Sequence, residues 1–383
     1  MSGAKSGSKC RLTINGRTIE AAPGTTLVDA GLSGRILVPH DCLTGQCETC
    51  RVRLVSGSVD DRGTRIADTV LACQATLIGD ATIFFDEVPP VLRVGGTVTD
   101  MRSLAPDIAE VVVALNAPLE ILPGQYLNVR FAGFPGRDYS PAPDLEGGYD
   151  PGEARLHVRL LPGGIVSGAI GRAIRPGHKA QIRGPLGAAF LRPGSGPLIL
   201  VSGGTGFAPV WSVARAARLS QPGRDLFLVT GMRRREEVYM ESALDWLIDH
   251  GALEAFATVE EDPGNRFRPG RPTHYLPSLG VDDTVIVAGS AGLVEAVRRK
   301  AVAAGARVHA DPFVASRETL SMVGRLMQSL RSGASAESIL SPRPQGVSAE
   351  AGPLPGGRRF EPAQEPAERR PASIGRRAGE GGS

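Results

Sequence analysis

The stretch "HDCLTGQCETC", residues 40–50, brings together three of the five cysteines in the chain. Cys42, Cys47 and Cys50 follow the spacing C-x4-C-x2-C, so three sulfur ligands lie on one short loop. A fourth cysteine, Cys73, follows after 22 residues, which leaves room for two strands before the chain returns. Five unevenly placed cysteines in a long chain do not indicate a disulfide framework, so the pattern predicts a metal centre.

The order of the cysteines indicates which metal centre is present. The spacing C-x4-C-x2-C, followed at a distance by one further cysteine, is typical of plant-type [2Fe–2S] clusters. Structural zinc sites usually combine two C-x2-C-like pairs, and Cys73 has no such partner. A Rieske centre needs Cys-x-His pairs, whereas His40 precedes Cys42 and no second pair exists. We therefore expect the four cysteines to hold a [2Fe–2S] cluster and Cys10 to lie outside the site in the first strand.

The composition sets limits on the class of protein. The 383 residues suffice for two or three domains, and 42% hydrophobic with 22% charged residues is ordinary for a globular protein. A net charge of +3 gives no indication of a nucleic-acid or membrane partner. The first residues, "MSGAKSGSKC", lack the apolar core of a secretory signal, and no apolar run reaches the roughly 18 residues needed to cross a bilayer. These features predict a cytoplasmic protein with reduced thiols.

The first two segments of the chain are rich in strand patterns. Residues 10–88 alternate apolar and polar positions, with a hairpin signal at Asn15 and Gly16 and a short helix over 25–33, before a Pro-Pro break. Residues 91–193 contain several short strand patterns separated by Pro and Gly turns. Such spacing predicts a closed or nearly closed antiparallel barrel.

The pattern then changes to alternating strands and helices. Residues 194–316 contain five strand-sized apolar runs with amphipathic helical stretches between them, which predicts a parallel sheet covered by helices. The helices are expected over 208–221, 236–250 and 291–305. Residues 317–383 are rich in Pro, Gly, Ala and Arg, so we expect a disordered tail with one possible helix over 318–331.

Two short motifs in the barrel segment carry flavin-type chemistry. "RDYS", Arg137 to Ser140, offers a guanidinium for a phosphate, an aromatic face for a flat ring and a hydroxyl for a ring nitrogen. In "LLPGGIVSGAI", Gly163 and Gly164 precede an expected helix start. Exposed N–H groups there, with the Ser167 hydroxyl, are suited to a pyrophosphate.

The segment "VSGGTGFAP", residues 201–209, lies between an expected strand and an expected helix. Its three glycines let the backbone approach a phosphate, and a threonine adds a donor. The residues concerned are Gly203, Gly204, Thr205 and Gly206. This is not the G-x-G-x-x-G pattern of a standard dinucleotide fold.

These motifs and their order resemble known families. Residues 10–88 resemble a plant-type ferredoxin domain, and the next two segments resemble the FAD-binding barrel and the GGTGxAP nucleotide domain of the ferredoxin–NADP reductase superfamily. Together, residues 10–316 resemble the NAD(P)H reductase component of multicomponent bacterial oxygenases of the naphthalene or benzoate dioxygenase type. The resemblance implies a β-grasp [2Fe–2S] domain at 10–88, an FAD barrel at 91–193 and an NAD(P)-binding α/β domain at 194–316.

The resemblance also implies roles for individual residues. Ser140 is expected to bond flavin N5, Tyr139 to stack on the flavin ring, and Arg137 to neutralise the pyrophosphate. Further cofactor contacts are expected from His157, Arg159, Gly164, Val166, Ser167, Gly203, Gly204, Thr205, Gly206, Arg233, Glu237, Gly289 and Phe313. No general acid or base is needed, because the protein's part is to align nicotinamide with flavin and to fix their distance.

Several positions depart from the family pattern or leave alternatives open. Ala288 stands where the family has a cysteine beside the nicotinamide, and Leu293 replaces a methionine. Phe313 either covers the flavin ring or belongs to the core. Arg234 and Arg235 either accept the 2′-phosphate of NADPH or are solvated surface charges.

The expected activity is electron transfer from NADH or NADPH through FAD to the cluster, and then to an oxygenase component or a Rieske-type ferredoxin. We expect a monomer with no nucleic-acid or membrane partner, whose acceptor docks on an exposed rim from Leu43 to Thr49, with Glu48 as the test position. A reductase of a diiron monooxygenase, a regulatory flavoprotein without redox activity and a zinc-stapled binding protein are the alternatives.

Overall fold

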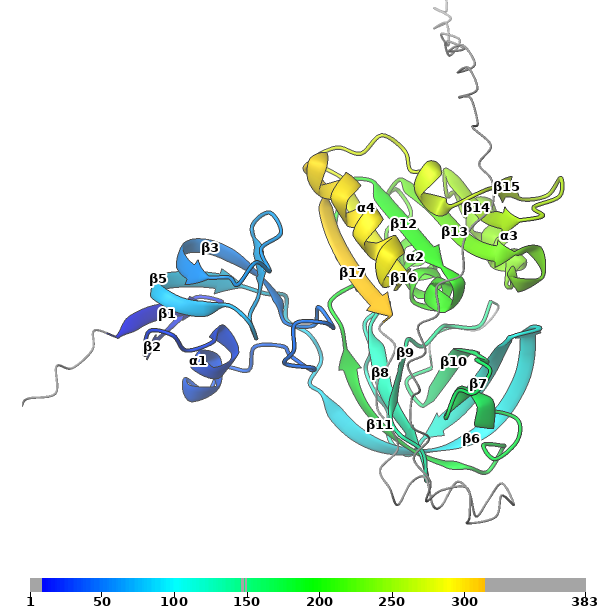
Figure 1. Ribbon diagram of the computed structural model, residues 1–383, viewed down its shortest axis with the longest axis horizontal. Coiled ribbons are helices and arrows are strands. Elements are labelled where there is room, and N and C mark those ends of the chain that lie inside the picture. The colour runs from blue at the N-terminus through cyan, green and yellow to red at the C-terminus, as the bar shows by residue number, and fades with distance from the viewer. Residues whose placement is uncertain (1–8, 146–147, 149, 314–383) are drawn as a thin grey trace, which may run out of the picture. The chain divides into compact units, whose positions relative to one another are not determined.

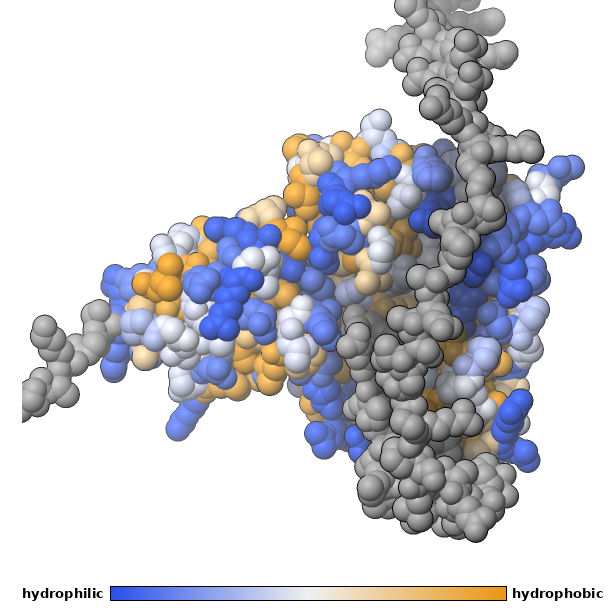
Figure 2. Space-filling view, viewed as in Figure 1, coloured by the Kyte–Doolittle hydropathy of each residue, from blue (hydrophilic) through white to orange (hydrophobic). Residues whose placement is uncertain are grey.

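The computed structural model describes residues 9–145, 148 and 150–313 (Figure 1). The expected tail over 317–383, with its helix, lies outside the described residues. Within them the chain forms three separate sheets of five, six and six strands, in the order in which the sequence patterns appear. Among the helices of this described part, none is long and apolar enough to cross a membrane. The surface in Figure 2 mixes hydrophilic residues with small groups of apolar ones.

The first sheet has the order β2-β1-β5-β3-β4, with β1 and β5 parallel and the other pairs antiparallel. Asn15 and Gly16 both have positive φ angles and form the predicted hairpin turn between β1 and β2. The helix α1 begins after Thr26, whose hydroxyl accepts a hydrogen bond from the Asp29 N–H. This is the expected β-grasp arrangement. Its elements are β1 (Cys10–Ile14), β2 (Arg17–Ala21), α1 (Leu27–Ser33), β3 (Arg51–Asp60), β4 (Thr69–Leu71) and β5 (Thr76–Phe84).

The second sheet is the predicted antiparallel barrel, with the order β10-β7-β6-β11-β8-β9. A bridge between Pro141 and Leu156 joins its two edges, because Pro141 follows β9 and Leu156 lies in β10. Val111 and Val113 of β7 face the barrel core, while Ile108 packs into the core of the parallel sheet. The strands are β6 (Leu92–Ala105), β7 (Ile108–Leu115), β8 (Tyr126–Phe131), β9 (Arg137–Tyr139), β10 (Glu153–Arg159) and β11 (Lys179–Leu186).

The third sheet is parallel, with the order β15-β14-β13-β12-β16-β17. Helices α2 and α3 pack on one face and α4 on the other, as the yellow α4 in front of the strands in Figure 1 illustrates. Strand β12 is central, and the strand order changes direction beside it. The elements are β12 (Leu198–Gly203), α2 (Phe207–Ser220), β13 (Leu226–Arg234), α3 (Glu241–Asp249), β14 (Glu254–Glu261), β15 (Arg268–Pro269), β16 (Thr284–Ser290), α4 (Ala291–Ala303) and β17 (Arg307–Phe313).

The expected helix over 236–250 was too long at its start. A 3₁₀ turn occupies Arg235–Glu237, and Met240 has a left-handed φ of 56°, so the α-helix begins only at Glu241. The apolar periodicity had included Val238 and Tyr239, whose burial comes from packing in the core of the parallel sheet and not from helix formation.

The "RDYS" motif coincides with the short strand β9, Arg137–Tyr139, which pairs with β8, and with the residue that follows it. One expectation in the barrel needs correction. The segment after Gly164 is a single 3₁₀ turn, Ser167–Ala169, and not a helix start. The short strands β4 and β15 carried no pattern that would have predicted them.

Candidate functional site

The cysteine loop lies between α1 and β3, and three of its residues have positive φ angles. Leu43, Gly45 and Glu48 have φ values of 57°, 78° and 60°, which turn the backbone toward the thiols. The Thr44 N–H donates to Cys42 Sγ at 3.4 Å. Such backbone donors are the groups that stabilise sulfur ligands and tune a cluster.

The four predicted ligands lie in two hydrogen-bonded pairs. Cys42 bonds Cys47, which lowers the pKa of Cys42 to about 4 and raises that of Cys47. Cys50 bonds Cys73, and burial raises the pKa of Cys50 to about 12. The Ala72 N–H, beside Cys73, donates to the Cys50 carbonyl at 2.9 Å and ties the second pair together.

Two thiol pairs fit a two-iron cluster, in which each iron takes two protein sulfurs. The described residues contain no group of three or more His, Cys, Asp or Glu side chains placed to hold a single metal ion. Cys10 lies in the first strand, β1, as expected, and is 5% exposed.

The expected exposed rim over 43–49 is only partly exposed. Leu43 is 54% exposed, but Glu48 and Thr49 are each only 7% exposed. Glu48 is ion-paired with Arg51 and with Arg298, so reversing its charge would break buried contacts whatever docks there. The prediction of an exposed rim is therefore wrong for Glu48 and Thr49.

A cavity of about 990 Å³ joins the cysteine loop to the barrel and the parallel sheet. This volume lies at the upper end of the range for ligand pockets. The cavity wall includes all residues of the RDYS motif and much of the segment around Gly164. Its predicted cofactor residues are Arg137, Tyr139, Ser140, His157, Arg159, Gly164, Val166, Ser167, Thr205 and Phe313.

The RDYS motif contributes a ring and a hydroxyl to the cavity wall. Tyr139 packs against the barrel core, and burial raises its pKa, so the phenol stays neutral. Ser140 is 6% exposed and donates to Asp311 Oδ2 at 3.4 Å. Burial raises the pKa of Asp311 to about 7, despite the hydrogen bond from Ser140. Asp311 was not among the predicted site residues, because it comes from β17, the last strand of a different sheet.

Two predicted residues project from β10 toward the parallel sheet. His157 Nε2 lies 3.7 Å from Glu110 Oε2, and its Nδ1 is buried without a protein hydrogen-bond partner. Burial alone would raise the pKa of Glu110, but hydrogen bonds from His157 and Arg102 outweigh it and hold the pKa at about 2. An unpartnered ring nitrogen on a cavity wall fits a site for a polar cofactor.

Arg159 connects the cavity to the expected nucleotide loop. Its guanidinium bonds Asp107 at 2.9 Å and Glu237 at 2.5 Å. Glu237, expected to contact the nucleotide, is 3% exposed and also pairs with Arg234 at 3.0 Å. The structure thus brings one predicted flavin residue and one predicted nucleotide residue into direct contact.

The turn after Gly164 is closed by Ser167. The Leu161 N–H donates to Ser167 Oγ at 3.2 Å, and a Cβ on Gly164 would lie 2.2 Å from the same oxygen. A larger residue at position 164 would therefore displace this hydroxyl. Val166, which is 2% exposed, anchors the turn in the barrel core.

The glycine-rich loop lies at the carboxyl end of β12, where the order of the parallel sheet changes direction. Open α/β sheets bind ligands at such a point. A 3₁₀ turn over Gly204–Gly206 leads into α2, and a Cβ on Gly206 would lie 2.3 Å from the Ala288 carbonyl oxygen. Gly289 has a φ of 137° and packs against Gly203. The glycines at these positions therefore let the ends of β12 and β16 pack closely against each other.

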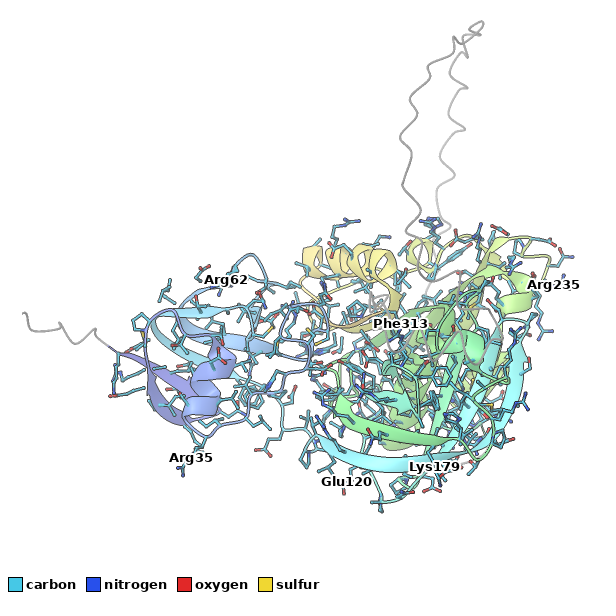
Figure 3. The ribbon with its side chains drawn as sticks, turned by 60° about the horizontal axis from the view of Figure 1, so that its bottom comes forward. Arg35, Arg62, Glu120, Lys179, Arg235 and Phe313 are labelled. Atoms are coloured by element: carbon cyan, nitrogen blue, oxygen red, sulfur yellow. The ribbon has the colours of Figure 1, made fainter. Side chains whose placement is uncertain are left out.

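The arginines at the end of β13 and the phenylalanine at the end of β17 differ in their contacts and exposure. Arg233 pairs with Glu261 at 2.7 Å, and Arg234 pairs with two glutamates. Arg235 is exposed, and Figure 3 shows it at the outer edge of the domain, whereas Phe313 lies in the interior of the view. Phe313 is 39% exposed and lines the cavity, so the alternative that it belongs to the core is wrong.

Comparisons with known proteins agree with these three parts. Residues 12–77 match the family described as 2Fe-2S iron-sulfur cluster binding domain. Residues 96–190 match the oxidoreductase FAD-binding domain, and residues 200–299 match the oxidoreductase NAD-binding domain. These matches define an iron–sulfur flavoprotein oxidoreductase that uses a nicotinamide nucleotide.

Individual relatives indicate which kind of iron–sulfur flavoprotein the chain is similar to. The chain is 34% identical over 323 residues to the ferredoxin–NAD(P)+ reductase component of naphthalene 1,2-dioxygenase/salicylate 5-hydroxylase systems of a Ralstonia species, covering 78% of this chain and 96% of that protein. It is 34% identical over 265 residues to the corresponding naphthalene 1,2-dioxygenase component of Pseudomonas putida, covering 66% and 80%. The crystal structure of an Amycolatopsis cytochrome P450 reductase is similar, with a TM-score of 0.59 and 28% identity over 79% of this chain and 98% of that one.

The chain therefore belongs to the family of ferredoxin–NAD(P)+ reductase components of oxygenase systems. It transfers electrons from NAD(P)H through FAD to a [2Fe–2S] cluster. The thiol pairs and the cavity described above fit these cofactors.

Proposed function

We propose that this reductase passes its electrons to an oxygenase component or a Rieske-type ferredoxin of an aromatic ring-hydroxylating dioxygenase. The observation that carries the proposal is the 34% identity over nearly the whole length of a naphthalene dioxygenase-type reductase component. We place the domain boundaries at 10–88, 91–193 and 194–316, as the sequence patterns indicate. In keeping with the lack of a strong net charge, we propose a cytoplasmic monomer without nucleic-acid or membrane partners.

The flavin, when bound, accepts a hydride and releases its two electrons one at a time. We propose that Tyr139 stacks on the flavin ring and that Ser140 forms a hydrogen bond with flavin N5. Arg137 neutralises the charge of the pyrophosphate. His157 Nδ1 supplies a further polar contact in the cavity. Together these residues fix the ring in one orientation, which is the main contribution a protein makes to hydride transfer.

The nucleotide is assigned to the glycine-rich loop at the carboxyl end of β12. Gly203 to Gly206 expose backbone N–H groups at the start of α2, a site suited to a pyrophosphate. Phe313, exposed at the cavity, is positioned to cover the flavin ring until nicotinamide replaces it. We assign Arg233, Glu237 and Gly289 to the same nucleotide site, where Glu237 acts through Arg159.

The four cysteines are assigned to the cluster in the pairs that the structure shows. Replacing Cys73 by serine removes one ligand from the second pair. We expect the purified variant to lose the visible absorption and the low-temperature paramagnetic signal of a [2Fe–2S] cluster while keeping flavin absorption.

A direct test of the partner measures electron transfer to two acceptors. The reduced holoprotein is mixed with the Rieske ferredoxin of a naphthalene-type dioxygenase and, separately, with the hydroxylase of a diiron monooxygenase. Faster reduction of the Rieske ferredoxin supports the proposal. Faster reduction of the diiron protein overturns it.

A monooxygenase system is the second candidate, because other relatives are components of monooxygenases. A xylene/toluene monooxygenase electron transfer component of Pseudomonas putida is 30% identical over 280 residues, and an alkene monooxygenase reductase component of Xanthobacter autotrophicus is 31% identical over 295 residues. These sequence identities lie close to those for the dioxygenase reductases, so sequence identity does not separate the two kinds of partner. Which genes lie next to the gene for this protein is independent evidence for one partner or the other.

A further inference from the structure

The cysteine loop is bonded to the flavin barrel at both of its ends. Asp41, directly before Cys42, accepts a hydrogen bond from the Tyr126 hydroxyl at 3.0 Å. The other carboxylate oxygen of Asp41 pairs with Arg183 at 2.5 Å. At the far end of the loop, Thr49 Oγ1 lies 3.1 Å from the same Tyr126 hydroxyl. One phenol from the barrel therefore links the two ends of the loop.

The donors and acceptors at this phenol can be assigned. Tyr126 has a single O–H, and a carboxylate can only accept, so Tyr126 donates to Asp41. Thr49 must then donate its hydroxyl hydrogen to the Tyr126 oxygen. Tyr126 is 5% exposed, so both bonds are sheltered from water. Loss of the hydroxyl would leave Asp41 and Thr49 without this shared partner.

Tyr126 occupies the wall between the cysteine loop and the predicted flavin site. It begins β8, and its neighbour Leu127 is paired across the strands with Tyr139. The same cavity wall contains Cys42 and Cys47 on one side and the RDYS motif on the other. Tyr126 thus lies between the cysteine loop, to which it is hydrogen-bonded, and the strand that carries Tyr139.

A third contact holds the loop from the parallel-sheet side. The buried carboxylate of Glu48 pairs with Arg298 of α4 at 3.2 Å and also with Arg51 of its own domain. The Arg298 side chain is 17% exposed, so this pair is largely shielded from solvent. The loop is therefore held against both the barrel and the nucleotide domain by buried polar contacts.

We propose that Tyr126 is a positioning residue that fixes the Cys42–Cys47 edge of the cluster against the flavin cavity, with Asp41 and Thr49 as its partners. This inference rests on the flavin and cluster sites assigned under the proposed function. In each passage one electron leaves the flavin and one enters the cluster, no atom is transferred, and NAD(P)H remains the only electron donor. Tyr126 takes no part in this redox change and acts only by holding the geometry.

The test is Tyr126→Phe in the full chain loaded with both cofactors. The ring and its packing remain, and only the two hydrogen bonds are lost. Anaerobic stopped-flow mixing with NADH follows flavin bleaching and cluster bleaching separately. We expect an unchanged rate of flavin reduction and a roughly tenfold slower electron transfer to the cluster, because two hydrogen bonds no longer bias the docked arrangement.

A second measurement does not depend on electron transfer. Hydrogen exchange of the backbone amides over 41–49 should be faster in Tyr126→Phe than in the unaltered protein, since the loop loses its anchor. Arg183→Gln, a change in the barrel alone, should raise exchange at the Asp41 end of the loop and slow cluster reduction in the same direction. The control is Tyr275→Phe, which removes a phenol bonded to the Pro269 carbonyl at 2.8 Å in the nucleotide domain.

The outcomes separate this inference from the proposed function. Slower cluster reduction together with faster exchange over 41–49 in Tyr126→Phe, and unaltered behaviour in Tyr275→Phe, supports it. Normal cluster reduction or normal exchange in Tyr126→Phe overturns it. If the flavin of the unaltered protein is not bleached by NADH or NADPH, the proposed function itself fails, and the inference fails with it.

Discussion

At the residue scale, Asp311 is a buried carboxyl group whose pKa can be tested. Burial raises that pKa from its usual 3.8 to about 7. Between these values the folded protein holds a proton that the unfolded chain releases, so the free energy of unfolding falls as the pH rises from about 4 to 7 and levels off above. A shift of this size corresponds to at most about 4 kcal/mol.

We predict that Asp311→Asn removes this contribution. Measured by urea unfolding at equal cofactor content, the variant should gain stability relative to the unaltered protein as the pH rises from 4 to 7. Glu236→Gln, an exposed position, is the control and should show no such trend. Parallel pH profiles for Asp311→Asn and the unaltered protein would show that Asp311 is already ionised at low pH.

Gly206 provides a second prediction at this scale. A Cβ at this position would lie 2.3 Å from the Ala288 carbonyl oxygen, so Gly206→Ala must push apart the ends of β12 and β16. We expect a loss of about 1–3 kcal/mol in stability and weaker NADH binding by calorimetry. Gly292→Ala is the matched control, because a Cβ there meets no atom within 4 Å. Equal behaviour of the two variants would count against the close approach.

Some functional residues could be predicted from the sequence and others could not. The cysteine loop and the RDYS and GGTG residues could be nominated from the sequence because each motif is contiguous and its chemistry depends on local spacing. Asp311 and Tyr126 could not be predicted, because their roles arise from contacts between different domains. Glu48 was misjudged for the same reason, since its partner Arg298 lies in a distant helix.

At the scale of elements, the loop after β13 contacts the barrel through an ion pair and an aromatic contact. Glu237 of this loop bonds Arg159 of β10, and Tyr239 packs its ring against His157 at 5.4 Å between centroids. These contacts explain why α3 begins at Glu241 and not at the expected residue 236. The residues before Glu241 contact the barrel, so they are not part of the helix.

We predict that Glu237→Gln loosens this loop. The amide cannot pair with two guanidinium groups as the carboxylate does, so stability should fall by about 1–3 kcal/mol and the Kd for NADH should rise. Thermal unfolding and calorimetric titration measure both effects. Glu236→Gln serves as the control, because Glu236 is exposed and its pairing with Arg234 spans 3.4 Å. An unchanged Kd in Glu237→Gln would remove Glu237 from the nucleotide site.

Element boundaries were predictable where one interaction dominates. The Asn15-Gly16 turn and the capped helix α1 follow from local chemistry. The strands β4 and β15 are only 3 and 2 residues long, so they are held by their neighbours and leave no periodic signal.

At the scale of the whole molecule, three domains place a nucleotide site, a flavin cavity and a cluster loop in sequence along one chain. The order could be predicted because each domain has its own pattern and its own motif. The cavity of about 990 Å³ could not be predicted, because its wall combines residues from Asp41 to Phe313.

The central claim is that electrons pass from NAD(P)H through flavin to the cluster. Anaerobic titration of the holoprotein with NADH and with NADPH, followed by visible absorption, tests it most directly. We predict that one or both nucleotides bleach the flavin and then the cluster, and that Cys73→Ser retains only the flavin bleaching. A holoprotein whose flavin is bleached by neither nucleotide would contradict the account.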